Sequence, residues 1–313
     1  MSYQVRSESP DDYDAIDLVE CQAFGGIDEA DLVRLMRARH PGYDAKFSVV
    51  AVDDCQIVGH VLFTPADVRL MGKTVRALCV GPVAVSPSRQ KQGFGRAMLE
   101  FGHDMGRQAG FSFVYLLGNP DYYSRIGYTA CYGFAEIEIN AGALGEPEVE
   151  ILPSPVAETD LQWLTERHAA ELANVDFGWL RGPDINEWTL PGLNSVVWWT
   201  ADGRRAGYSV HRSGYSANRA GVGEVNLILA DEPELALDII RTIKPSKIAQ
   251  HPSGWLARNV VDPAWGTCSV RRSRAAMAIA LQPGALDEYI AAVESGARSS
   301  GHGNFPPAFE LLG

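Results

Sequence analysis

The chain has 313 residues, enough for one large domain or for two domains of ordinary size. Hydrophobic residues make up 46% and charged residues 21% of the sequence, so the chain can bury a sizeable core. The formal net charge of −12 argues against non-specific binding to nucleic acid or to an anionic membrane, because both require basic patches. It is compatible with a cationic amine as substrate, although many cytosolic proteins also have an acidic surface.

The cysteine pattern predicts free, buried thiols in a reducing compartment. The chain has five cysteines, an odd number, with no CxxC motif and no histidine at metal-ligand spacing. The N-terminal residues lack a basic and then apolar signal pattern, and no apolar run approaches the length of a membrane span. We therefore expect a soluble, cytoplasmic protein with no metal site and with neither a nucleic acid nor a membrane as partner.

The first half of the chain has the element order of a mixed α/β (α+β) sheet. The expected elements are a strand at 3–7, a helix after 9–12, a helix at 28–39, strands at 47–52, 57–64 and 77–85, a helix at 94–108, a strand at 111–117, a helical turn at 121–125 and a strand at 128–134. Antiparallel strands followed by strand–helix–strand predict a parallel pair in the middle of the sheet.

A domain boundary is expected in the middle of the chain. Residues 141–157 contain several glycines and prolines, and all seven tryptophans lie beyond residue 160. We therefore predict a first domain at 1–145, a linker at 146–157 and a second domain at 158–313.

The second half predicts a similar order of elements with one difference. Its expected elements are a hairpin at 196–200 and 207–210, a strand at 224–230, a helix at 234–243, strands at 246–250 and 277–281, and a helix at 285–293. No glycine-rich loop precedes the helix at 234–243, where Asp231-Glu232-Pro233 stands instead. We interpret this half as a degenerate copy that cannot bind a pyrophosphate in the same way.

The segment 82–96 predicts a phosphate site, since a strand leads through a short loop into a helix that begins among glycines. Gly93 and Gly95 can adopt positive φ and expose backbone N–H groups. At a helix N-terminus these groups favour a bound phosphate. Arg89, Lys91 and Arg96 add positive charge.

Three phosphate-loop patterns were compared with this segment. The Walker pattern GxxxxGK[ST] is absent, and the dinucleotide pattern GxGxxG fails at its third glycine, where Met98 stands. The pattern [QR]xxGx[GA] fits Gln90-Lys91-Gln92-Gly93-Phe94-Gly95. Such a short pattern also describes an ordinary glycine-rich strand–helix corner.

The surrounding residues decide between these two interpretations. Gly81-Pro82-Val83-Ala84-Val85-Ser86-Pro87 precedes the loop, and Leu117-Gly118-Asn119-Pro120-Asp121-Tyr122-Tyr123-Ser124-Arg125-Ile126-Gly127-Tyr128 follows about twenty residues after it. Two motifs in this order and at this separation resemble the GNAT acetyltransferase superfamily, in particular its predicted bacterial branch. The resemblance is sharpest over 78–134, extends over about 3–145, and implies the GNAT acyl-CoA N-acyltransferase fold.

The resemblance implies acetyl-CoA as co-substrate. The strands at 77–85 and 111–117 would splay apart, and the pantetheine arm would lie between them against backbone groups of Val83 and Val85, as an extended ligand pairs with a free strand edge. The pyrophosphate would bind the loop, for which the candidate residues are Gln90, Lys91, Gln92, Gly93, Phe94, Gly95 and Arg96. Asn119 either contacts the cofactor or caps the short helix.

Acetyl transfer to an amine requires a proton donor for the departing thiolate, and a phenol within hydrogen-bond reach can supply the proton. Tyr123 matches the family position of this general acid. The alternative is that Tyr122 and Tyr123 both fill the core. We expect the core role for Tyr122 and the acid role for Tyr123.

No single residue stands out as general base. Glu20 on the first helix and His60 in a strand are the candidates. A histidine in an apolar strand is more often a satisfied core residue, and a helix glutamate is more often solvated. A water chain could also deprotonate the amine.

The two-domain layout resembles the enhanced-intracellular-survival type of acetyltransferase, which carries a further C-terminal domain that this chain is expected to be too short to contain whole. In that group the terminal carboxylate can act as base; here the tail 305–313 is apolar enough to dock, but a frayed end is expected. Four tryptophans could line a groove between domains, although aromatic residues more often belong to the core: Trp179, Trp188, Trp198 and Trp199.

The sequence therefore predicts an N-acetyltransferase that moves an acetyl group from acetyl-CoA to a primary amine of a small molecule or peptide. A homo-oligomer is compatible with the sequence. The alternative is a non-catalytic acyl-CoA-binding sensor whose second domain docks a partner protein, and a third option is an acyl group longer than acetyl.

Overall fold

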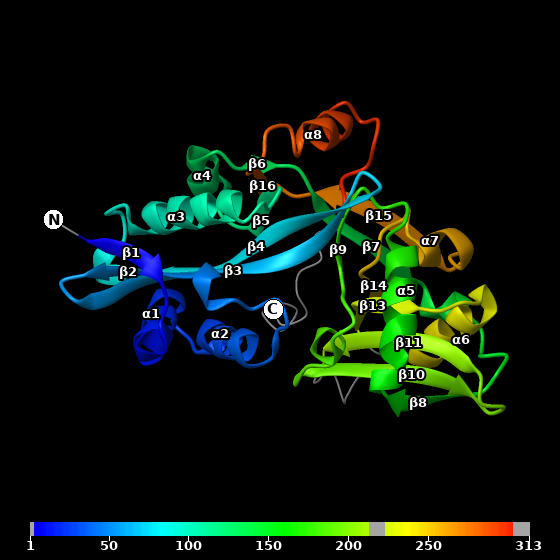
Figure 1. Ribbon diagram of the computed structural model, residues 1–313. Helices are drawn as coiled ribbons and strands as arrows, with labels where there is room; N and C mark the ends of the chain where they lie inside the picture. Colours follow the sequence, from blue (N-terminus) through cyan, green and yellow to red (C-terminus); the bar gives the residue numbers. More distant parts are fainter. Residues whose placement is uncertain (1–2, 213–222, 303–313) are drawn as a thin grey trace.

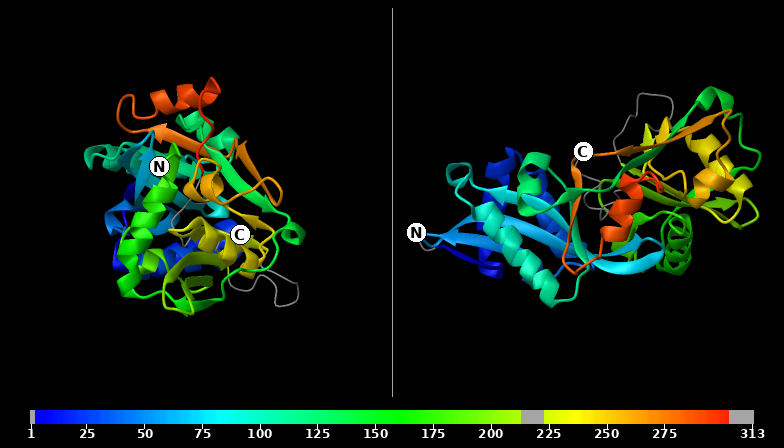
Figure 2. Two further views of the ribbon diagram at one scale, coloured as in Figure 1. Left: turned by 90° about the vertical axis from the view of Figure 1, so that its right-hand side faces the viewer. Right: turned by 90° about the horizontal axis from the view of Figure 1, so that it is seen from above.

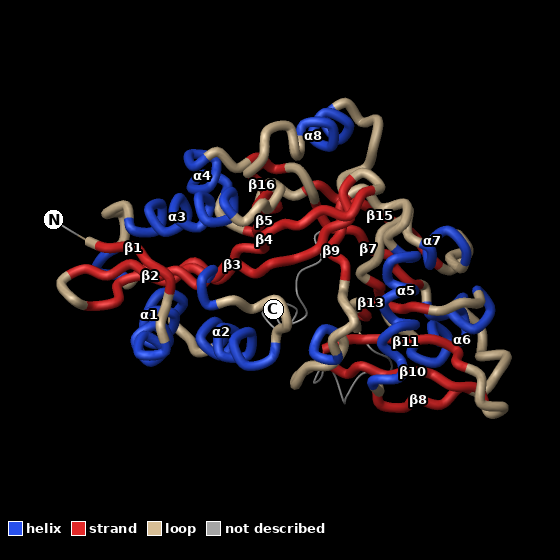
Figure 3. The backbone as a smooth tube through the Cα atoms, viewed as in Figure 1, coloured by secondary structure: helices blue, strands red, loops and turns tan. Residues whose placement is uncertain are grey.

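The computed structural model describes residues 3–212 and 223–302, and its largest sheet organises the first half of the chain (Figures 1 and 3). Within these residues the sheet has the strand order β1-β2-β3-β4-β5-β16-β6, and β9 pairs with β3. The strands are β1 (Gln4–Ser7), β2 (Ser48–Asp53), β3 (Gln56–Leu70), β4 (Lys73–Val85), β5 (Phe113–Leu117), β6 (Thr129–Ala130), β9 (Phe177–Leu180) and β16 (Ala276–Ala280). Its central pair, β4 and β5, is parallel, as predicted.

Helices cover both faces of this sheet. The helices α1 (Tyr13–Phe24) and α2 (Asp28–Arg39) lie on one face, and α3 (Phe94–Gln108) and α4 (Pro120–Tyr123) lie on the other (Figure 1). Buried Met98 and Leu99 attach α3 to the sheet, and buried Leu32 and Met36 attach α2. The predicted ranges of α2 and α3 are confirmed, because their apolar residues recur at helical spacing and their ends carry local stop signals.

The hairpin of β3 and β4 is longer than predicted. Its turn lies at Met71 and Gly72, which both have positive φ, of 47° and 78°. The expected strands stopped at residue 64 and began again at residue 77. Residues 65–70 of β3 alternate between buried and more exposed side chains, and this end of β3 pairs with β9, a strand from far along the chain.

Two smaller sheets and three helices form the rest of the described second half (Figure 2). One sheet has the order β13-β11-β10-β8, and the other has the order β12-β14-β7-β15. Their strands are β7 (Gly133–Ile139), β8 (Ile151–Pro155), β10 (Leu193–Thr200), β11 (Arg205–Arg212), β12 (Glu224–Val225), β13 (Leu227–Leu229), β14 (Lys247–Ile248) and β15 (Gly266–Arg272). The helices are α5 (Leu161–Glu171), α6 (Pro233–Ile243) and α7 (Trp255–Asn259), while α8 (Asp287–Glu294) packs beside the first sheet.

Strands are exchanged across the middle of the chain. From the second half, β9 and β16 join the first sheet, and β16 lies between β5 and β6. From the first half, β7 joins the sheet of β14 and β15. Part of the segment expected as a linker forms β8. The domain boundary at 146–157 stays a prediction. The exchange of strands between the two halves was not predicted, because pairing between distant strands leaves no local signal in the sequence.

Three of the four tryptophans proposed as core residues are buried. Trp179, Trp188 and Trp198 have exposed fractions of 3%, 0% and 8%, and Trp199 is half-buried. The expectation of buried cysteines is wrong in part, since all five are free but Cys55 and Cys268 are exposed. The tail at 305–313 lies outside the described residues.

A buried carboxylate in the second half links stability to pH. Glu171, at the end of α5, is 3% exposed; its Oε2 accepts a 2.8 Å hydrogen bond from the Leu256 amide, and its Oε1 has no partner. Burial raises its pKa from 4.5 to about 7, despite opposing hydrogen bonds. Between these pH values the folded chain keeps a proton that the unfolded chain has lost, so stability falls as the pH rises.

We predict that Glu171→Gln removes this pH dependence. A pKa shift of this size corresponds to about 3 kcal/mol, so the variant gains up to that much stability over the wild type between pH 5 and pH 8. Urea unfolding at the two pH values measures the difference. Glu166→Gln, an exposed carboxylate on the same helix, is the control and should show no such gain. An equal stability difference at both pH values would refute the assignment.

Candidate functional site

The site begins where the central strands separate. The paired residues of β4 and β5 are Ala77 with Phe113, Leu78 with Val114 and Cys79 with Tyr115. Beyond Cys79, β4 continues to Val85 beside β3 only, while β5 continues to Leu117 beside β16. The two strands thus form a fork that opens toward the loop at 86–93, as the splayed strands of the resemblance implied.

Beyond Cys79, the edge of β4 that faces the fork has no partner strand among the described residues, and there the Val85 carbonyl accepts only a 3.2 Å hydrogen bond from the side chain of Gln90. The Ser86 amide donates a 2.9 Å hydrogen bond to the Val58 carbonyl on β3. In an antiparallel ladder, backbone groups of successive residues point alternately toward and away from the partner. Those of Val83 and Val85 therefore point away from β3 and into the fork. An extended ligand could pair with them as an added strand would.

The loop ends at the uncapped start of α3. Gly93 is the N-cap residue with φ of 93°, no side chain caps the helix, and nothing lies within 4 Å of a Cβ built at this glycine. The amides of the first turn have no acceptor within the helix, and the helix dipole adds partial positive charge. These groups fit a pyrophosphate, because its oxygens can accept hydrogen bonds from amides that otherwise face solvent.

The side chains predicted to bind the cofactor at this loop are either exposed or hydrogen-bonded to the loop itself. Lys91 is exposed and also has positive φ, of 62°. Gln90 and Gln92 brace the loop, since their side-chain amides donate 3.2 Å hydrogen bonds to the carbonyls of Val85 and Ser88.

The side chains of Arg96 and Phe94 are engaged in other contacts. Arg96 is exposed and forms a 2.7 Å ion pair with Glu100. The Phe94 side chain is buried against the ring of Tyr3, so only its backbone amide faces the site. Cofactor binding by the residues of this loop stays a prediction.

Tyr123 lies at the opposite side of the fork, on α4. Its ring packs on Gly118, where a Cβ would come within 2.1 Å of the ring. The side chain also belongs to the core cluster of Val80 and Leu116, the first residues of β4 and β5 after their last pair. Burial raises the pKa of Tyr123 above its usual value, which keeps the phenol protonated and able to donate. Asn119 caps α4, because its Oδ1 accepts a 2.9 Å hydrogen bond from the Asp121 amide.

Tyr122 does not fill the core, so that expectation is wrong. Its side chain is 38% exposed and turns toward the loop, where its hydroxyl is 2.7 Å from a Cβ built at Gly95. Gly95, unlike Gly93, has no positive φ. The absence of a side chain at position 95 therefore provides space for Tyr122. Neither motif alone predicts this contact between α3 and α4.

Glu20 and His60 form a buried pair on the other face of the sheet. Both are 0% exposed, and Glu20 Oε1 lies 2.5 Å from His60 Nδ1. The interpretation of Glu20 as a solvated helix charge is wrong, because α1 packs this residue against β3 and β4. Burial raises the pKa of Glu20 above its usual range, and its Oε2 has no hydrogen-bond partner.

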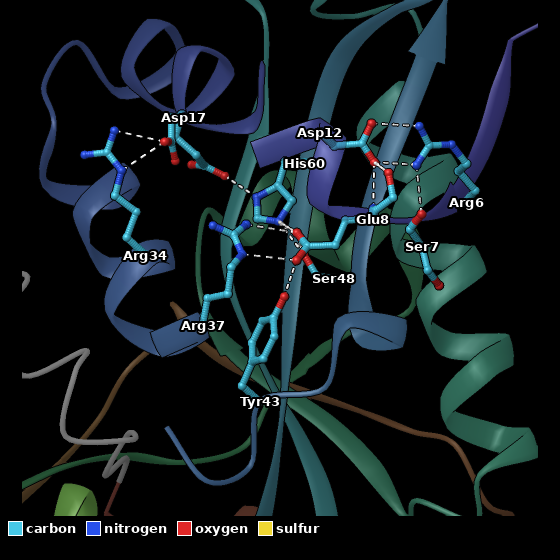
Figure 4. A network of polar contacts seen from close by, with 12 residues as sticks. Arg6, Ser7, Glu8, Asp12, Asp17, Arg34, Arg37, Tyr43, Ser48 and His60 are labelled. Carbon is cyan, nitrogen blue, oxygen red and sulfur yellow. Dashed lines mark hydrogen bonds and ion pairs between the residues drawn. The ribbon is translucent and has the colours of Figure 1, made fainter. Parts of the chain in front are cut away.

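A chain of hydrogen bonds continues from His60 (Figure 4). His60 Nε2 is 2.9 Å from Ser48 Oγ, and the Ser48 hydroxyl donates to Glu8. Glu8 is also bound by Arg37 and by the hydroxyl of Tyr43. Burial opposes the charge of Glu8, but these hydrogen bonds outweigh it and lower its pKa. The roles of Ser48 and its neighbours were not predicted, since serines and charged residues of this kind are common on surfaces.

The donors in this chain locate one mobile proton. Because the Ser48 hydroxyl donates its proton to ionised Glu8, its oxygen must accept from His60 Nε2–H. Nδ1 then shares a single proton with Glu20. The pair exists either as neutral histidine with glutamic acid or as an imidazolium–carboxylate ion pair. The pair can accept the proton of an amine only after this shared proton has left.

A forked parallel pair with a free strand edge that leads to an uncapped helix start defines the class of acyl-CoA N-acyltransferases. Residues 4–131 match the family described as "Acetyltransferase (GNAT) domain". The uncharacterized N-acetyltransferase YhbS of Escherichia coli K12 is 32% identical over 124 residues, which are 40% of this chain and 72% of YhbS. A crystal structure of E. coli YhbS in complex with CoA covers 41% of this chain and 69% of its own, with 32% identity and a TM-score of 0.37.

Two solved structures share the fold over most of the chain. A GCN5-related N-acetyltransferase from Anabaena variabilis covers 90% of this chain and 73% of its own, with 12% identity and a TM-score of 0.68. Eis1 from Mycobacterium abscessus covers 89% and 74%, with 14% identity and a TM-score of 0.62. The chain belongs to the GNAT superfamily of acetyl-CoA-dependent N-acetyltransferases.

Two kinds of feature are absent from residues 3–212 and 223–302. In these ranges no helix combines the length and the apolar character needed to cross a bilayer. The same residues contain no group of three or more histidine, cysteine, aspartate or glutamate side chains arranged to hold a metal ion.

Proposed function

We propose that the chain transfers the acetyl group of acetyl-CoA to a primary amine of a small molecule or peptide by direct attack. The observation that carries the proposal is the free edge of β4, which runs from the fork at Cys79 to the uncapped start of α3. Pantetheine would pair with Val83 and Val85, and the pyrophosphate would accept hydrogen bonds from amides at 93–96. The thioester then lies in the fork.

The reaction needs one proton donor and one proton acceptor, and the two candidates lie on opposite faces of the sheet. The amine nitrogen attacks the carbonyl carbon, a C–N bond forms and the C–S bond breaks. The thiolate leaves with the electron pair of that bond and takes the proton of Tyr123. The proton of the ammonium group passes through water to the pair of Glu20 and His60, because that pair is buried and cannot touch the amine directly.

The binding half of the proposal is tested by Gly93→Ala. An alanine at φ of 93° is strained by roughly 1–3 kcal/mol, so the loop relaxes away from the geometry that presents its amides. We expect the Kd of CoA to rise about tenfold, measured by calorimetry. Gly203→Ala is the matched control, since Gly203 has φ of 82° in an equally open turn outside the site. It should cost similar stability and leave the Kd unchanged. Equal CoA affinity of the Gly93 variant and wild type would overturn this binding mode.

A further inference from the structure

We propose that Tyr122 is a positioning residue that donates a hydrogen bond to the CoA pyrophosphate and thereby holds Tyr123 in place for the reaction. The inference rests on the proposed function, and it assigns a task to a residue that the two motifs leave unexplained. Three observations carry it: the contact of Tyr122 with Gly95, the position of its hydroxyl beside the start of α3, and the contact of its ring with Tyr123.

The first contact places the hydroxyl of Tyr122 at the phosphate loop. A Cβ built at Gly95 would lie 2.7 Å from this oxygen and 3.8 Å from the carbon that bears it, so the end of the side chain rests on the backbone of the first turn of α3. The next nearest atom, Val85 Cγ2, is 3.6 Å away. Gly95 therefore accommodates Tyr122 in particular.

The hydroxyl of Tyr122 lies where an anion can bind. A helix start gathers anions, and a phenol beside it can add one donor to the amides. No hydrogen bond involves the Tyr122 hydroxyl among the described residues, so its proton is available for a ligand. Partial burial raises its pKa, which keeps it a donor, and the side chain is still 38% exposed. A phosphate oxygen at the mouth of α3 would satisfy both the amides and the hydroxyl.

The third contact connects the loop with the proposed acid. The rings of Tyr122 and Tyr123 meet edge to face, with centroids 5.0 Å apart and planes at 81°. Both residues lie in the single turn of α4 that Asn119 caps. When a ligand fixes Tyr122 against Gly95, it also restricts the neighbouring ring. Occupation of the loop and orientation of the acid are thus coupled through one pair of side chains.

The test is Tyr122→Phe, with CoA and pantetheine as probes. Loss of a hydrogen bond to a charged group should raise the Kd of CoA about tenfold in calorimetry. Binding of pantetheine, which has no phosphate, should be unchanged when followed by ligand-observed NMR. Tyr3→Phe is the control, because Tyr3 is also half-exposed beside the first turn of α3 but packs on Phe94. Unchanged CoA affinity, or equal weakening of both probes, would overturn the proposal.

A double-mutant cycle separates this role from a general loss of structure. When Tyr122 is present, the methyl group introduced by Gly95→Ala collides with the Tyr122 hydroxyl, so this substitution should raise the Kd of CoA. In the Tyr122→Phe background that oxygen is absent, so the same methyl group should add little further loss. Additive losses would contradict the contact. Wild-type protein that binds CoA but acetylates no amine would overturn the proposed transfer and leave this result intact, so the two failures are distinguishable.

Discussion

Replacing Tyr123 by phenylalanine should lower kcat by about 10²- to 10⁴-fold, the range typical of a lost general acid. The thiolate would then leave without a proton donor, although the ring would still fill the space above Gly118. Release of CoA thiol across an amine library, measured for wild type and variant, gives the comparison. Because the ring is kept, the variant should bind CoA with unchanged affinity.

The control for this variant lies next to it in the chain. Tyr122→Phe should mainly weaken CoA binding and should lower kcat far less than Tyr123→Phe does, because it keeps the ring that contacts Tyr123 and loses only the hydrogen bond to the pyrophosphate. If Tyr123→Phe turned over at the wild-type rate, Tyr123 would not be the acid. If the wild type bound CoA but released no thiol with any amine, the alternative of a non-catalytic acyl-CoA sensor would replace the proposal.

Replacing Glu20 by glutamine should lower kcat by about 100-fold and change its pH dependence. The amide keeps the shape of the side chain but cannot accept the proton of the amine. In the wild type, burial raises the pKa of Glu20, and the base must be deprotonated to act. Activity should therefore rise with pH as Glu20 loses its proton, and this inflection should vanish from the profile of the variant.

Asp14→Asn is the matched control for Glu20, because Asp14 is an exposed carboxylate on the same helix. It should leave both the rate and the pH profile unchanged. A Glu20→Gln enzyme with the wild-type inflection would show that another group, or water alone, deprotonates the amine. Thermal unfolding of each variant checks that the buried network still folds, since a lost activity in an unfolded chain carries no information about the base.

Features fixed by neighbouring residues could be predicted from the sequence. Helix α3 was predicted with its correct range because its apolar spacing, its glycine at the start and its polar end all lie within fifteen residues. The fork was implied by the resemblance to the GNAT superfamily, which rests on two motifs about twenty residues apart. Asn119 was left between two roles, and the capping role is visible in the structure because it depends on an amide only two residues away.

Features that depend on distant residues could not be predicted. Glu20 and His60 are forty residues apart, and nothing in either segment indicates that α1 buries the carboxylate against the histidine. The sequence pattern predicts that Tyr122 fills the core, because it does not show the space beside Gly95. Burial, and with it the direction of a pKa shift, is a property of packing between elements that local patterns do not record.

The position of β16 has a consequence for synthesis of the chain. Its residues pair with β5 on one side and with β6 on the other, and the Ala275 carbonyl accepts a hydrogen bond from the Gly118 amide, directly before α4. A ribosome makes these residues only after it has made β5, β6 and all the other strands described above. Until then the edge of β5 is unpaired and the turn that carries Tyr123 lacks its support. The first half of the chain therefore cannot complete its sheet by itself during synthesis. A polypeptide that ends before β16 would contain every predicted active-site residue without an assembled active site.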